Sequence, residues 1–163
     1  MPSRGDYFHE YLKKKSTKKI IDVYGDRIDF IKHEQPQNNH VIKEQNYFKI
    51  KITLGSPWHD SIELENLIFA DVVVQVNRTQ KEINFEREKR KGESIPEKKI
   101  VIIECETTQS SLVTGKSNPK YHSYKLIKHK HGDDIVLILA TFNDINVKTD
   151  LFDSNLIWRF KRP

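Results

Sequence analysis

The chain has 163 residues, with 28 Lys and Arg against 23 Asp and Glu, which gives a formal net charge of +5. This length predicts a single compact domain over residues 1–163. The one cysteine, Cys105, excludes a disulfide framework within the chain and is typical of a reducing compartment, so we expect a cytoplasmic location. No apolar run approaches the ~18 residues of a membrane span, and the N-terminus lacks the apolar stretch of a signal peptide, so we expect no membrane partner.

The charge balance leaves two interpretations open. An isoelectric point near 9.2 favours an acidic partner, of which nucleic acid is the commonest. A net charge of +5 is also an ordinary charge for solubility.

The first residues predict a helix over 5–15, because Tyr7 and Phe8 are followed four residues later by Tyr11 and Leu12. An acid near its start and three lysines at its end suit the helix dipole. Residues 18–34 fit two structures. The spacing of four apolar residues fits a helix, whereas alternation around Gly25 and Asp26 fits a hairpin. The four residues are Ile20, Tyr24, Ile28 and Ile31.

Five segments have the patterns of strands. Residues 47–54 alternate between apolar and polar side chains, which predicts a half-exposed strand. Residues 67–76, 100–107 and 133–142 are nearly continuous apolar runs, which are typical of strands buried on both faces. Residues 155–161 predict an edge strand that ends in a basic tail.

Two further segments complete the expected fold. Residues 77–99 are dense in charges of both signs, which favours a solvated loop or hairpin, with an arm facing nucleic acid as the alternative. Asn118 as N-cap, Pro119 as first helical residue and Gly132 as stop predict a helix over 119–131. Strand, helix and strand then form a βαβ unit with parallel strands, and the fold class is a mixed α/β sheet with flanking helices.

Three acids interrupt the most apolar strands. Asp71 lies within LIFADVVVQV, and Glu104 and Glu106 lie within KIVIIECETT. A buried carboxylate costs several kcal/mol unless it is paired, hydrogen-bonded or bound to a cation. Alternation puts Glu104 and Glu106 on one face with Cys105 opposite, where Cys105 fits a small core residue. Oxygen ligands on two adjacent strands suit a hard divalent cation, so we expect the three carboxylates to approach one Mg²⁺ or Mn²⁺ ion.

These segments resemble the PD-(D/E)XK nuclease superfamily. FADVVVQ corresponds to its Asp strand, IVIIECETT to its Glu strand, and NPKYHSYKLIKHKHG and DDIVLILATF to the helix and strand that follow. The resemblance implies a restriction-endonuclease-like core with element order αβββαβ, with its core over about 47–142. It also implies Mg²⁺-dependent hydrolysis of phosphodiester bonds, with DNA as the partner. Asp71, Glu104 and the main-chain carbonyl of Cys105 would hold the metal.

The motif departs from the family at two places. Ala70 stands where a proline often precedes the aspartate, and Glu106 stands at the usual place of the lysine. Some members bring that lysine from the following helix. Lys120 in the first turn of the 119–131 helix is our first expectation for it, followed by Lys125 and then Lys116.

The same lysine-rich region supplies the expected contacts to nucleic acid. Lys116, Lys125 and Lys128 are the expected contact residues, and residues 81–99 are a second expected surface. Two other functions remain open. One is a nucleic-acid-binding module that kept the fold and lost the chemistry, and the other is a protein-interaction domain whose acids pair with lysines. The assembly is also left open and includes a homodimer.

Overall fold

The computed structural model describes residues 4–33, 70–115 and 119–163. Their strands form one mixed sheet in the order β1-β2-β3-β4-β5. β1 and β2 are antiparallel, β2 and β3 are antiparallel, and β3, β4 and β5 are parallel to one another. The strands are β1 (Ile28–His33), β2 (Val72–Asn77), β3 (Lys98–Cys105), β4 (Ile135–Phe142) and β5 (Ile157–Phe160).

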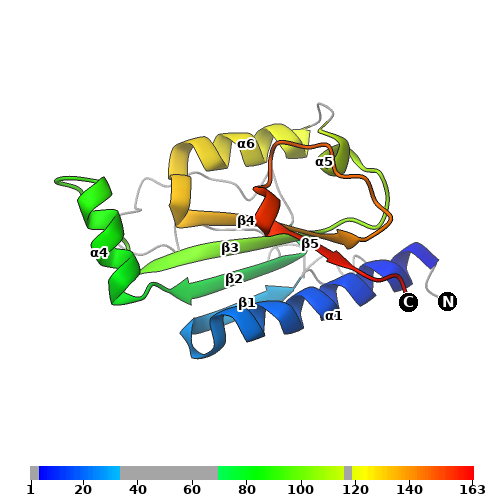
Figure 1. The fold of residues 1–163 in the computed structure, drawn as a ribbon, viewed down its shortest axis with the longest axis horizontal. Coiled ribbons are helices and arrows are strands. Elements are labelled where there is room, and N and C mark those ends of the chain that lie inside the picture. The colour runs from blue at the N-terminus through cyan, green and yellow to red at the C-terminus, as the bar shows by residue number, and fades with distance from the viewer. Residues whose placement is uncertain (1–3, 34–69, 116–118) are drawn as a thin grey trace, which may run out of the picture.

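Helices cover both faces of this sheet, as Figure 1 shows. α1 (Arg4–Tyr24) lies along one face, and α6 (Pro119–His131) lies on the other, next to the short α5 (Ser111–Thr114). α4 (Gln80–Lys89) stands at the end of the sheet where β2 ends and β3 begins. Short 3₁₀ turns lie at residues 25–27, 132–134 and 154–156. The mixed α/β sheet with flanking helices is therefore confirmed.

The βαβ unit is confirmed in its details. β3 and β4 are parallel and α6 connects them, beginning at Pro119. β4 is almost completely buried, as expected for a strand covered on both faces. Among the described strands, β5 pairs with β4 alone, which makes it the predicted edge strand. The strand predicted over 47–54 lies outside the described residues.

The first helix is longer than the predicted 5–15, because its buried stripe continues. Leu12, Ser16 and Ile20 succeed one another at four-residue intervals and are all fully buried. The helix stops at Gly25, whose φ of +54° is a conformation that favours glycine. β1 then follows at Ile28. Residues 18–34 thus contain parts of both open alternatives: a helix first, and a strand after the glycine turn.

The prediction of a loop or hairpin over 77–99 is wrong, since this region contains α4. A capping box starts the helix: the Thr79 hydroxyl accepts from the Glu82 amide, and the Glu82 carboxylate accepts from the Thr79 amide. Several of the charged side chains that favoured a loop form ion pairs instead. Glu82 binds Arg27 and Lys99, and Glu86 binds Arg90.

A buried ion cluster fixes the end of the sheet next to α4. Asp134 is fully buried, and its Oδ1 accepts from Nη2 of Arg78 at 2.5 Å. Arg90 donates to both of its oxygens at 3.1 Å. Arg78 also donates to the carbonyl of Pro96 at 2.8 Å. The cluster therefore ties the end of β2, the end of α4 and the start of β4 together.

Replacing Arg78 should destabilise the fold strongly. Arg78→Ala removes the more deeply buried of the two arginines that bind Asp134 and leaves Arg90 alone to compensate this carboxylate. Breaking a buried pair costs about 3–5 kcal/mol, and we expect the lower end of this range because Arg90 remains. Lys125→Ala is the control, because it breaks an exposed pair with Asp150, and exposed pairs contribute little to stability. Urea unfolding measures both free energies. Equal losses in the two variants would contradict the role of this cluster.

Candidate functional site

Asp71 and Glu104 meet at the opposite end of the sheet from α4. Val72 pairs with Ile103 in the antiparallel ladder, so the next pair along is Asp71 with Glu104, at the start of β2 and the end of β3. Both are buried: Asp71 is 5% exposed and Glu104 is 1% exposed. Two carboxylates in this environment require strong partners.

Asp71 is held by hydrogen bonds from two elements. Its Oδ2 accepts from the backbone N–H of Cys105 at 2.7 Å, which links it to the end of β3. Its Oδ1 lies 2.9 Å from Nε2 of His9 on α1. The carboxylate therefore joins the sheet to the α1 layer.

Glu104 is held from the other layer. The hydroxyl of Tyr124, a fully buried residue of α6, donates to Oε1 of Glu104. Burial first, and then the charge of Glu104, raise the pKa of the Tyr124 hydroxyl well above its usual value. The charges of Asp71 and Glu106 raise this pKa further. The negative charges of all three predicted acids thus raise the pKa of the Tyr124 hydroxyl, and Glu104 also accepts its hydrogen bond.

Glu106 follows the end of β3 and is partly exposed. Its N–H donates to the carbonyl of Ala140 at 3.0 Å, and its own carbonyl accepts from the hydroxyl of Thr141 at 2.7 Å. Both contacts fix its backbone against the end of β4. The side chain of Glu106 therefore starts from a rigid position close to the two buried acids.

Cys105 places its backbone and its thiol in different environments. Burial first, and next the charge of Asp71, raise the pKa of the thiol well above its usual value, which makes it unreactive. The N–H of Cys105 points toward Asp71, and the next N–H along the strand points toward Ala140 on the opposite side. The carbonyl of Cys105 is trans to that second N–H, so it points to the Asp71 side. This is the carbonyl predicted to bind the metal.

The structure does not gather all three acids around one point. Within residues 4–33, 70–115 and 119–163, no three His, Cys, Asp or Glu side chains are grouped closely enough to hold a metal ion. Asp71 is directed to the α1 layer and Glu104 to the α6 layer by their hydrogen bonds. The expectation that the three carboxylates approach one Mg²⁺ or Mn²⁺ ion is therefore not met among the described residues.

The predicted lysines have different environments. Lys125 is exposed, and its ammonium donates to Asp150 at 2.8 Å, in the segment after β4. Lys128 is partly buried and donates to the carbonyl of Ile135 at 3.3 Å. Lys120 lies in the first turn of α6, but the structure does not describe its side chain. Lys116 lies outside the described residues. Lys125 and Lys128 are therefore bonded to groups other than the three acids.

Sequence analysis missed two residues of the site, His9 and Lys13. They lie four residues apart on α1, on the face that carries Leu12 and Ser16. His9 contacts Asp71, and Lys13 is only 8% exposed, with its ammonium 3.2 Å from Glu10 Oε1. The charge of Lys13 also acts on the pKa of the Cys105 thiol, opposing the rise that burial causes. Had the predicted helix been extended to Ile20, a helical wheel would have placed His9 and Lys13 on the buried face of α1.

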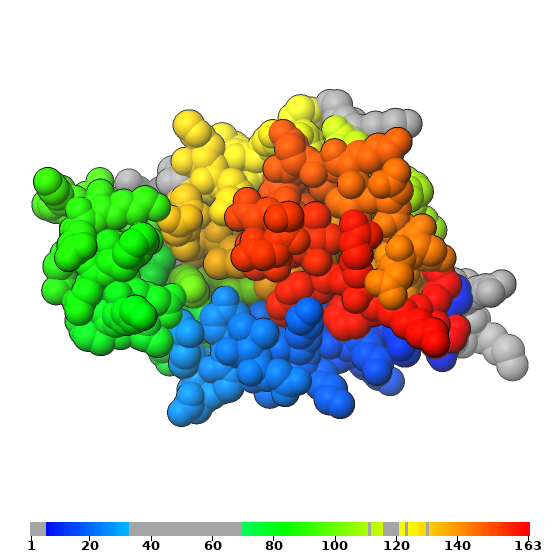
Figure 2. All heavy atoms as spheres, in the orientation of Figure 1, coloured from blue at the N-terminus to red at the C-terminus, as the bar shows by residue number. Residues whose placement is uncertain are grey.

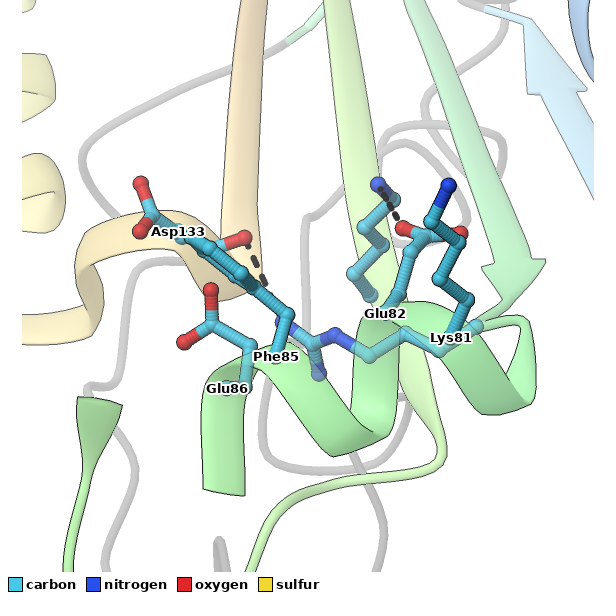
Figure 3. A pocket seen from close by; sticks show the side chains of 7 residues that line it. Lys81, Glu82, Phe85, Glu86 and Asp133 are labelled. Atoms are coloured by element: carbon cyan, nitrogen blue, oxygen red, sulfur yellow. Dashed lines mark hydrogen bonds and ion pairs between the residues drawn. The ribbon is translucent and has the colours of Figure 1, made fainter. Parts of the chain in front are cut away.

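A pocket of about 310 Å³ lies at the other end of the sheet, where four residues of α4 line it (Figure 3). Its lining carries equal numbers of cationic and anionic side chains, and Lys99 is bonded to Glu82 within it. The lining residues are Arg78, Lys81, Glu82, Phe85, Glu86, Lys99 and Asp133. Because these charges balance, the pocket is poorly suited to a phosphate.

No protein-family model matches this sequence, and comparisons with curated proteins and with solved structures found no match. The site is therefore interpreted from its own residues. Among the described helices, none combines the length and the apolar character needed to cross a membrane.

Tyr124→Phe should destabilise the protein, because it removes the donor from a buried carboxylate. The expected loss is about 1–3 kcal/mol in the free energy of unfolding, measured with urea. Tyr121→Phe is the matched control, since its hydroxyl binds the exposed Asp150 at 2.6 Å, and it should cost less than about 1 kcal/mol. A loss in Tyr124→Phe no larger than in Tyr121→Phe would contradict the importance of this bond.

Glu82 should make stability depend on acid pH. Burial alone would raise its pKa, but hydrogen bonds from Lys99 and the Thr79 amide, with the charges of Lys99 and Arg27, lower it to about 2. A lowered pKa gives stability that is present above about pH 4.5 and lost as the pH falls toward about 2. The stability difference between wild type and Glu82→Gln should therefore shrink over this range in urea unfolding. A difference that is constant with pH would refute the shift.

Proposed function

We propose that this protein is a metal-dependent nuclease that hydrolyses phosphodiester bonds of DNA, with its active site at Asp71 and Glu104. The observation that carries the proposal is the pair of buried carboxylates at adjacent strand ends, 5% and 1% exposed. Keeping two such charges in a core is costly, and a bound cation would offset that cost. The third acid, Glu106, follows two residues later on a fixed backbone.

The order of elements supports the same proposal. Among the described elements, α1, β1, β2, β3, α6 and β4 occur in the order αβββαβ that is expected of a restriction-endonuclease-like core, with α4 and α5 between them. Residues 34–69, which separate β1 from β2, lie outside the described residues. Asp71 directly precedes the second strand of this series, and Glu104 lies near the end of the third.

The chain offers three ligands for Mg²⁺ or Mn²⁺: the carboxylates of Asp71 and Glu104 and the carbonyl of Cys105. Such an ion supplies Lewis-acid chemistry, since it lowers the pKa of a bound water and neutralises charge on a phosphate oxygen. The protein orients its ligands. His9 and the Cys105 amide hold Asp71, and Tyr124 holds Glu104, in the way that outer contacts fix metal-binding carboxylates.

Glu106 and Lys13 are the groups suited to proton transfer and charge stabilisation. Glu106 is partly exposed, so it can accept a proton from an attacking water. Lys13 brings a buried positive charge to the Asp71 side of the sheet, where it would stabilise negative charge on the phosphate. We therefore assign to Lys13 the role of the motif lysine. The sequence makes Lys120 the first expectation for this role.

A nucleic-acid-binding module without catalysis is the second candidate. It is favoured by Glu106, which stands at the usual place of the motif lysine. In the described part of the chain, no three-residue metal group is present. In this function the buried acids hold α1 and α6 to the sheet, and the fold serves binding alone.

Asp71→Asn and Glu104→Gln should each reduce Mg²⁺-dependent or Mn²⁺-dependent DNA cleavage at least ~100-fold, about 2.7 kcal/mol of activation free energy. Both substitutions keep the side-chain shape and remove the charge that binds the metal. Asp150→Asn, which alters an exposed acid, is the control and should cleave normally. Mn²⁺ should also raise the melting temperature of the wild type and not of Asp71→Asn, because only the wild type binds it.

Two results would reject the nuclease proposal. One is cleavage that is the same in all four proteins, which would point to a contaminating nuclease. The other is DNA binding by the wild type with no cleavage under either metal, which would establish the binding module instead.

A further inference from the structure

The positive charge of the chain is concentrated in two segments. Residues 4–24 and 157–163 together carry nine Lys and Arg and three Asp and Glu, a net charge of +6. The whole chain has a net charge of +5, so all remaining residues together carry −1. A charge that served only solubility would have no reason to be distributed so unevenly.

The two charged segments lie side by side in the structure. α1 runs beside β5, and the C-terminal residues pass close to the first half of α1 (Figures 1 and 2). The ammonium of Lys19 lies 4.7 Å from the ring centroid of Trp158 in β5. The guanidinium of Arg162 lies 5.1 Å from the ring of Phe8. We call Lys15, Lys18, Lys19, Lys161 and Arg162 the α1–β5 surface.

Lys15, Lys18 and Lys19 of α1 are exposed, and none of them forms an ion pair with a carboxylate of the described residues. Three lysines elsewhere are paired: Lys89 with Asp133, Lys98 with Asp29, and Lys125 with Asp150. Arg162 of the α1–β5 surface is paired as well, because its guanidinium donates to both carboxylate oxygens of Asp144. The charge that the described carboxylates leave uncompensated on this surface is therefore the charge of the α1 lysines.

Aromatic rings hold these cations in place. The ammonium of Lys15 lies 5.5 Å from the ring of Tyr11, and Arg162 lies 4.3 Å from the ring of Phe142. Such contacts restrict long side chains and lower the entropy lost when an anion binds. Trp158 and Phe142 are themselves buried, so their rings offer no exposed face on which bases of a single strand could stack. The surface is thus suited to the phosphates of a duplex and poorly suited to exposed bases.

The α1–β5 surface also reaches the candidate active site. Nη2 of Arg162 donates to the carbonyl of Thr107 at 3.4 Å. Thr107 directly follows Glu106, so the surface extends to the end of β3 where the acids lie. A backbone bound along α1 would be led toward Asp71 and Glu104.

We propose that the α1–β5 surface binds the sugar–phosphate backbone of duplex DNA, independently of base sequence. The proposal rests on the proposed function, because it names the form of the substrate and the surface that holds it. This surface takes the place of α6 and residues 81–99, the surfaces expected from sequence, where Lys89, Lys98 and Lys125 are paired with carboxylates.

The test is fluorescence anisotropy with a labelled DNA duplex between about 50 and about 200 mM salt, without divalent metal so that no cleavage occurs. Lys15, Lys18 and Lys19 are replaced together by Gln. The matched control replaces Lys89, Lys98 and Lys125 by Gln and changes the net charge by the same amount. The surface variant should bind at least ~10-fold more weakly, and its log–log salt slope should fall by about 2–3. The control should stay within about twofold of wild type. Thermal unfolding confirms that both variants are folded.

Several outcomes would overturn the proposal: no binding by the wild type, equal losses in the two triple variants, or tighter binding to a single strand than to the duplex. Binding to phosphatidylserine vesicles but not to DNA would also overturn it. Failure of the nuclease proposal is distinguishable. Duplex binding that depends on the three lysines, with no cleavage when metal is added, rejects catalysis and retains the surface. Cleavage that is unchanged in the surface variant rejects the surface and retains catalysis.

Discussion

The carboxylate of Asp71 connects three parts of the fold that are far apart in the sequence. It receives the Cys105 amide from β3 and contacts His9 of α1, while its own backbone begins β2. The Cys105 amide lies just beyond the last residue pair of the β2–β3 ladder, so Asp71 replaces the partner that a longer β2 would supply. The end of the sheet, the position of α1 and the location of Glu104 all depend on this interaction.

The two ends of β2 are stabilised by the same kind of interaction and have different uses. At its end, Arg78 neutralises the fully buried Asp134, and a second arginine saturates that acid. At its start, Asp71 and Glu104 are bonded to a histidine, an amide and a tyrosine. These partners orient carboxylates without supplying the full positive charge of an arginine. The first end is thus built for stability, and the second retains the negative charge that a cation would need.

Electrostatics also separates the two faces of the molecule. Carboxylates pair with Lys89 of α4 and Lys125 of α6, whereas Lys15 and Lys19 of α1 are exposed and lie against aromatic rings. The net charge of a chain therefore gives little information about its partner, because it averages over these two faces. The spatial distribution of charge is the informative property.

The sequence by itself determined the elements whose signals are local. Continuous apolar runs predicted β3 and β4, Pro119 predicted the start of α6, and the acids within apolar strands predicted Asp71 and Glu104 as buried residues. α4 was missed although its capping box is a local signal, because its charged residues find partners such as Arg27 and Asp134 that are distant in the sequence. Only the tertiary structure decided that His9 faces Asp71, that Lys125 binds Asp150, and that α1 lies beside β5. Those contacts depend on how helices pack across a sheet, and no local pattern of residues encodes that arrangement.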